Sequence, residues 1–225
     1  STVKLYNGSI LLGSGTADSN GAFSITSSTL SDGVYSLTAT ATDAAGNTSS
    51  TSDPLSVLIK FFSSRTQLDT AVDVWISNES TARDIYGDIN TWDVSGITDF
   101  SNLFQRKSGF NSDISNWDVS NGTNFSYMFE QGSSFNQDIS DWDVSNGTNF
   151  TEMFQGASSF NQDIGNWNVG NAISFANMFN NTTAFNRDLS SWNVSSATDF
   201  HEMFQVASSF NQDIGNWDVS NGTDF

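Results

Sequence analysis

The feature that most constrains this chain is a repeated octapeptide. "FNQDIGNW" occupies residues 160–167 and returns unchanged at residues 210–217. The related segments "FNSDISNW" and "FNQDISDW" begin at residues 110 and 135, so the period is 25 residues. No insertion or deletion disturbs the register from Trp92 to Trp217. A fixed period of this size is typical of a solenoid, in which each unit buries its apolar face only against its neighbours.

Two apolar patterns recur in every unit. The first is I-x-x-W-x-V, as in Ile114, Trp117 and Val119, and the second is F-x-x-M-F, which begins at Phe125. The first has the strand spacing of a leucine-rich repeat, with the residue between Trp and Val pointing outward. The second suits one turn of α- or 3₁₀-helix on the opposite side. We therefore expect a mixed, mostly β fold, whose residues 92–225 form a leucine-rich-repeat-like solenoid with one strand and one short helix per coil.

The amino-terminal region follows different rules. Residues 1–59 alternate short apolar runs with the turn sequences "NG", "DSNG", "SDG" and "DAAGN", which favour tight turns between strands. Candidate strands lie at residues 3–6, 10–13, 22–26, 35–41 and 55–59, and together they predict a β-sandwich. Residues 60–91 would link the two regions. Within them, the spacing of Leu68, Ala71, Val72, Trp75 and Ile76 predicts an amphipathic helix over residues 65–76 that caps the solenoid.

Composition excludes several classes of function. The 25 acidic and 7 basic residues give a formal charge of −18, which repels nucleic acid and anionic membranes and favours cationic partners or metal ions. With no cysteine and only His201, neither a disulfide framework nor a histidine-based zinc site is expected. No run of 18 apolar residues is present, so we expect no direct membrane insertion of this segment.

Catalytic chemistry has little support in the sequence. His201 has no recurring Ser or Cys beside it, so a catalytic triad is not indicated. Glu152 and Glu202 share a column, but on the predicted helix they would be ordinary solvated side chains. We expect a protein that is not an enzyme. Because both ends of the sequence fall within strand-like or repeated runs, we also expect a monomeric segment of a longer chain.

One polar column is the candidate ligand surface. It occupies the outward position between Trp and Val and consists of Asp93, Asp118, Asp143, Asn168, Asn193 and Asp218, flanked by Asn116, Asp141 and Asn166. We call these nine residues the Trp–Val strip. Neighbouring parallel strands lie about 4.8 Å apart, so adjacent carboxylates need solvent or a cation between them. The hypothesis is that the strip lies on the concave face and binds calcium, a glycan or a basic protein segment; a merely solvated face is the alternative.

Three further sets of polar residues have a structural and a metal-binding interpretation. An acidic column would accept backbone N–H groups in tight turns or form a row of metal ligands: Asp113, Asp138, Asp163, Asp188 and Asp213. An amide column could bond from coil to coil as a structural ladder: Asn111, Asn136, Asn161, Asn186 and Asn211. Asp18, Asp43 and Asn47 offer oxygen atoms on turns where calcium could bind, although plain turn capping is the favoured explanation for them.

Both regions resemble bacterial surface proteins. From Arg65 to Phe225, on motifs such as "FNQDIGNWDVSNGTDF", the chain resembles the BspA-like leucine-rich repeats found in mycoplasma and Listeria lipoproteins. The stretch "GTADSNGAFSITSSTLSDGVYSLTATATDAAGNTSSTSDPLSVLI" resembles the bacterial Ig-like repeats that extend large adhesins, so residues 1–59 are identified as a partial Ig-like domain.

These resemblances imply an extracellular or cell-surface location and an adhesion module whose partner is a glycan or an extracellular host or matrix protein. The alternative is a structural spacer stiffened by calcium. One departure from the repeat family predicts looser packing after the strand, because small residues replace its usual Val: Gly122, Gly147, Ala172, Ala197 and Gly222.

Overall fold

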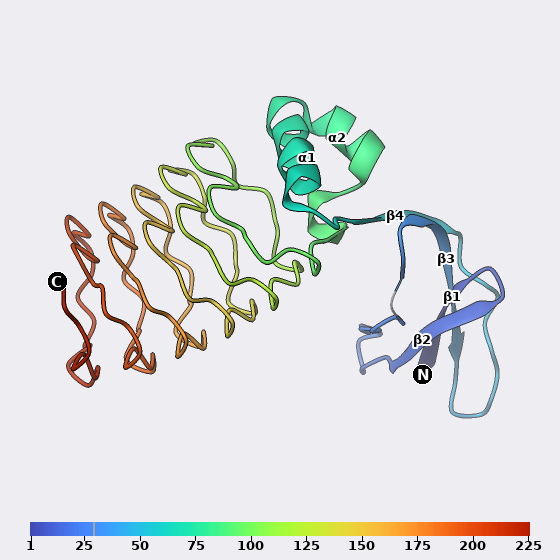
Figure 1. Ribbon diagram of the computed structural model, residues 1–225. Helices are drawn as coiled ribbons and strands as arrows, with labels where there is room; N and C mark the ends of the chain where they lie inside the picture. Colours follow the sequence, from blue (N-terminus) through green and yellow to red (C-terminus); the bar gives the residue numbers. More distant parts are fainter. Residues whose placement is uncertain (29) are drawn as a thin grey trace. The chain divides into compact units, whose positions relative to one another are not determined.

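A computed structural model of the chain describes every residue except Thr29 and separates two units, Ser1–Lys60 and Phe61–Phe225 (Figure 1). Each unit makes most of its contacts internally, and they are described in turn. No helix in the described part of the chain is both long and apolar enough to cross a bilayer.

The first unit is built on an antiparallel sheet. Its strands are β1 (Thr2–Asn7), β2 (Ile10–Thr16), β3 (Gly33–Thr42) and β4 (Leu55–Phe61), arranged in the order β2-β1-β3-β4. These correspond to four of the five strands that the sequence predicts. The turn sequences between apolar runs therefore identified real strand boundaries.

The strand expected at residues 22–26 does not form. Asp18 Oδ1 accepts the N–H groups of Asn20 and Ala22, at 2.8 and 2.9 Å, and this turn sends the chain back toward β2. The returning segment lies so close that a Cβ on Gly15 would be 2.4 Å from the Ser24 carbonyl oxygen. This segment therefore lies against the glycines of β2 but does not pair with it as a strand. The described residues of this unit thus form one sheet, so the β-rich unit expected from the sequence is present, but the fifth strand of the predicted truncated sandwich is not formed.

Two helices begin the second unit. Helix α1 (Arg65–Ser77) starts at the N-cap Ser64 and buries Leu68, Ala71, Val72 and Trp75, in agreement with the predicted helix over residues 65–76. Helix α2 (Glu79–Tyr86) starts at the N-cap Asn78, whose side chain accepts the Thr81 N–H. A short 3₁₀ turn, η1 (Ile89–Thr91), and β5 (Trp92–Asp93) lead into the repeats.

Helix α1 covers the first coil and supplies donors to it. The Arg65 guanidinium donates to the carbonyl oxygens of Asp99 and Ser101, at 3.0 and 2.5 Å. Trp75 packs edge-on against Trp92, with ring centroids 5.8 Å apart, and its indole N–H donates to Ser112 Oγ. The helix therefore occupies the place that a preceding coil would otherwise take.

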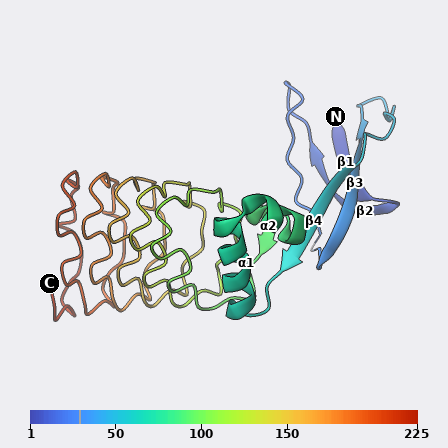
Figure 2. The same cartoon turned by 90° about the horizontal axis from the view of Figure 1, so that it is seen from above.

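The repeats stack as successive coils (Figures 1 and 2), but their local structure differs from the expectation. The I-x-x-W-x-V segment is a short link between two turns, closed by hydrogen bonds from Trp117 N–H to the Ile114 carbonyl and from Gly122 N–H to the Val119 carbonyl. Within the described repeats after β5, β-pairing is limited to single parallel bridges along one column: Asp99, Asn124, Asn149, Ser174, Asp199 and Asp224. The predicted strand per coil is therefore wrong.

The F-x-x-M-F segment is not a helix either. The N–H groups of Phe125, Tyr127 and Phe129 donate to carbonyl oxygens of the next coil, each at 2.9 Å. The alternate N–H groups bond within their own coil, as from Met128 to Phe125, and Tyr127 and Gln131 adopt positive φ angles of 60° and 55°. These segments, residues 124–131 and their equivalents at 25-residue intervals, form what we call the turn ladder.

The turn ladder is the concave side of the stack. Stacked rings in successive coils report the local coil spacing, which is 5.4–5.9 Å along the Phe column beside the ladder, from Phe100 to Phe225, and 6.3 Å for Trp92–Trp117 and for Trp192–Trp217 on the other side. A stack bends toward its more closely spaced side. The Trp–Val strip consequently lies on the wider side, and its assignment to a concave strand face is wrong.

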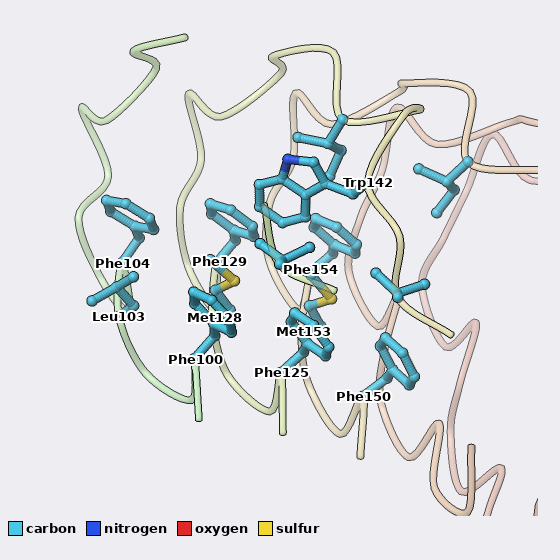
Figure 3. Close-up of a cluster of buried hydrophobic side chains, with 14 of the residues drawn as sticks. Phe100, Leu103, Phe104, Phe125, Met128, Phe129, Trp142, Phe150, Met153 and Phe154 are labelled. Carbon is cyan, nitrogen blue, oxygen red and sulfur yellow. The ribbon is translucent and has the colours of Figure 1, made fainter. Parts of the chain in front are cut away.

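Aromatic and thioether side chains fill the interior of the coils (Figure 3). Phe100, Phe125 and Phe150 stack in one column, with Met128 and Met153 packed beside them. All are buried to within 1% of complete burial. The interior is therefore a continuous apolar core that passes from coil to coil.

The Trp column adds a buried hydrogen bond to this core. The indole N–H of Trp142 donates to the Ile114 carbonyl of the preceding coil at 3.2 Å, and the other bonds of this kind are made by Trp117, Trp167, Trp192 and Trp217. Trp92 follows the cap, and its buried Nε1 has no hydrogen-bond partner among the described residues. A Trp indole therefore makes this bond only where another coil precedes its own.

The small residues after Val mark tight packing. A Cβ on Gly147 would lie 2.4 Å from Cζ of Phe150 and 2.9 Å from the Val144 carbonyl oxygen. Where Ala172 takes this position, the Phe150 and Phe175 rings are tilted by 17°, compared with 8° for Phe125 and Phe150. The expected looser packing is wrong, because the phenyl ring of the same coil fills the space that the Val side chain would need.

Comparing two Trp substitutions isolates the indole bond. We expect Trp142→Phe to lower the free energy of unfolding by about 1–3 kcal/mol more than Trp92→Phe, because only Trp142 loses a buried hydrogen bond, whereas Trp92→Phe removes an N–H group that already lacks a partner. Both changes remove the same volume. Urea denaturation of the two variants would measure the difference, and equal losses would show that the indole bond adds nothing.

A second comparison tests the close approach of Phe150. We expect Gly147→Ala to destabilise the protein by about 1–3 kcal/mol through overpacking. Gly109→Ala is the control, because a Cβ there meets nothing within 4 Å, and such an exposed change stays within about 0.5 kcal/mol. Thermal denaturation would compare them; an unchanged melting temperature for Gly147→Ala would contradict the packing analysis.

Candidate functional site

In every coil, the side chain of the Trp–Val strip that stands between Trp and Val caps a turn. Asp118 Oδ1 accepts the Ser120 N–H at 3.0 Å, and Asp143 Oδ1 accepts the Ser145 N–H at 2.9 Å. The same bond is made by the others in the column, Asp93, Asn168, Asn193 and Asp218. Hydrogen bonds from the Ser145 side chain and N–H hold the pKa of Asp143 below its usual range. One oxygen of each side chain therefore has a structural role.

The flanking residues of the strip, Asn116, Asp141 and Asn166, are exposed. Asp141 lines a hollow of about 270 Å³ together with Asp113 and Asp138. These acids do not converge on a point, since no group of three or more Asp, Glu, His or Cys side chains in the described chain is arranged to hold a metal ion.

The acidic column makes an equivalent set of turn caps. Asp113 Oδ1 accepts the Ser115 N–H at 2.9 Å, and Asp138, Asp163, Asp188 and Asp213 each accept the N–H two residues onward. The bond from the Ser140 N–H is the main cause that lowers the pKa of Asp138. This column is thus engaged in the backbone of every coil.

Amide side chains connect the coils in two columns. In the first, the N–H of Asn136 donates to Asn111 Oδ1 at 2.9 Å, and the same bond links Asn161, Asn186 and Asn211 in turn. The second column was not singled out from the sequence, although it recurs at the same period. There Asn121, Asn146, Asn171 and Asn221 donate to a carbonyl of the preceding coil.

The turns considered for calcium in the first unit are closed by their own side chains. Asp43 Oδ1 accepts the N–H groups of Ala45 and Asn47, and its Oδ2 accepts the Asn47 amide at 2.9 Å. The Asn47 side-chain bond is the main cause that lowers the pKa of Asp43. Asp18 caps its turn in a similar way. In this structure, Asp18 and Asp43 act as turn caps, and Asn47 donates to Asp43.

The turn ladder carries a cluster that sequence reasoning missed. Glu130 is only 3% exposed, its Oε2 accepts no hydrogen bond from any described residue, and Nε of Arg106 in the preceding coil lies 3.5 Å from that oxygen. A buried carboxylate without hydrogen bonds is costly. Its signal in the sequence is a single charge in a column that otherwise holds amides: Gln105, Gln155, Asn180 and Gln205.

Glu152, in the following coil, completes this cluster. Burial, and after it the negative charge of Glu130, raises the pKa of Glu152, and a hydrogen bond with the Tyr127 side chain acts in the opposite direction. Burial, followed by the charge of Glu152, also raises the pKa of Tyr127. The sequence placed Glu152 on a helix in ordinary solvent, whereas the structure places it on the turn ladder beside a second carboxylate.

Comparison with known proteins gives two family matches. The model of the family described as mycoplasma protein of unknown function, DUF285, matches residues 74–186 and 148–225, and that of the bacterial Ig-like domain matches residues 1–59. No curated protein and no solved structure matches this chain. An Ig-like domain joined to these repeats suggests a module of a bacterial surface protein. Because its match covers most of the chain, the protein belongs to the DUF285 family of mycoplasma proteins of unknown function and carries an amino-terminal bacterial Ig-like domain.

Proposed function

We propose that this chain is a non-enzymatic binding module of a large bacterial surface adhesin. Its ligand would be a glycan or an extracellular host or matrix protein, held on the turn ladder. Concave surfaces are the usual binding surfaces of solenoids, and the shorter coil spacing lies on the ladder side. This location replaces the Trp–Val strip that the sequence favoured.

The observation that carries the proposal is the variation of outward residues on an otherwise regular repeat. One ladder column reads Asn102, Tyr127, Glu152, Asn177 and Glu202 along successive coils. Their positive φ angles are alike, from 49° to 61°, so the backbone does not require different side chains. The Trp–Val column varies only between Asp and Asn, which both cap its turns. The ladder thus carries chemical variety that stacking does not need, as a ligand-binding surface would.

Two matched pairs of substitutions separate the faces. Gln131→Arg with Asn181→Arg places two cations on the ladder, and Asn116→Arg with Asn166→Arg places two on the strip. All four positions are exposed, and the members of each pair are two coils apart. We expect the ladder pair to weaken ligand binding by about tenfold or more, because long charged side chains block the surface, and the strip pair to leave it unchanged.

The measurement is binding of the full chain to arrays of glycans and matrix proteins, with calcium and again with EDTA. If only the strip pair loses binding, the ligand site lies on the Trp–Val strip and not on the ladder. Absence of binding in both buffers, combined with a higher melting temperature in calcium, would favour the spacer function instead.

A further inference from the structure

We propose that Tyr127, Glu130 and Glu152 form a binding site for one cationic group, an ammonium or guanidinium carried by the ligand. The site lies on the turn ladder, so this inference rests on the proposed function and assigns it a chemical class of ligand.

The charges of the cluster do not balance. Glu130 and Glu152 contribute two carboxylates, whereas Arg106 is the cation recorded beside them. The Arg106 side chain is 70% exposed and approaches Glu130 Oε2 at 3.5 Å without forming a hydrogen bond. One negative charge therefore remains, and Glu130, which is only 3% exposed, holds its share with little contact with water. The raised pKa of Glu152 agrees with this excess.

The accessible part of the cluster suits a cation. Tyr127 and Glu152 are both half-buried, so each retains exposed surface, whereas Glu130 is buried. A ring and a carboxylate side by side attract ammonium and guanidinium groups through cation–π and charge interactions. The buried carboxylate strengthens this attraction, because little solvent screens it. A cation bound at Glu152 would neutralise the negative charge of the cluster that Arg106 does not balance.

The same column two coils onward lacks these features. Glu202 accepts from the Gln205 amide at 2.8 Å and lies 3.4 Å from the Asn180 amide nitrogen. Both amides are neutral donors, His201 Nε2 lies 4.0 Å from Glu202 Oε2, and neither Tyr nor a second Glu stands in the ladder columns at residues 177 and 180. Glu202 is therefore a control with the same charge at an equivalent backbone position.

The test is an NMR titration of the full chain with Nα-acetyl-arginine amide, Nα-acetyl-lysine amide and the neutral Nα-acetyl-glutamine amide. We expect saturable shifts around Tyr127 with the two cations only, at millimolar affinity. Glu152→Gln should weaken cation binding by about fivefold or more, whereas Glu202→Gln should leave it unchanged. Tyr127→Leu, which removes the ring, should also weaken binding.

Equal weakening by Glu152→Gln and Glu202→Gln would overturn the proposal, because general attraction to an acidic protein would then explain the binding. Lack of saturation with either cation up to about 20 mM would overturn it too. The larger function is tested separately. The arrays could find a ligand whose binding is lost in the ladder pair, while the model cations do not bind in the titration. That combination would support the binding module and contradict the cation site.

Discussion

Hydrogen bonds between neighbouring coils are the constraint on which the solenoid depends. Along the turn ladder, the N–H of Phe125 donates to the Asn149 carbonyl, 24 residues onward, and across the core the Trp142 indole donates to Ile114, 28 residues back. One inserted residue would misplace both kinds of donor in that coil. Buried polar groups without partners are costly. The invariant 25-residue period is therefore a requirement of hydrogen-bond register as much as of apolar packing.

The first coil shows what this constraint implies at an end of the stack. Its ladder carbonyls face no preceding coil, and the Arg65 guanidinium of α1 donates to two of them. The indole N–H of Trp92 has no equivalent substitute and remains unpaired. The cap helix replaces the packing of a missing coil better than its hydrogen bonds, since Trp75 packs edge-on against Trp92. A helical cap thus reproduces the apolar contact and part of the polar contact of a missing coil.

The sequence predicts the period, the cap helix and four strands of the first unit, because each depends on spacing alone. It does not predict where the coils join. The spacing of I-x-x-W-x-V fits a strand and that of F-x-x-M-F fits a helix, yet the ladder forms in the latter through positive φ angles at residues such as Tyr127 and Gln131. Such angles are usually indicated by Gly or Asn. The Asp columns cap turns within their own coil, which the sequence could indicate, whereas the Asn columns find their partners only once coils are stacked.

The Glu130 cluster was missed for a related reason, since the burial of a charged side chain is visible only in three dimensions. In the sequence, a lone Glu among Gln and Asn is indistinguishable from an ordinary surface change. In the structure it is a carboxylate enclosed between coils that are already joined through their backbones. Because Tyr127 and Gln131 donate to the next coil through their N–H groups, the ladder does not depend on the side chain at residue 130. The scaffold can therefore tolerate an unfavourable charge at this position, and that tolerance lets a stack of nearly identical coils carry a site in only one place.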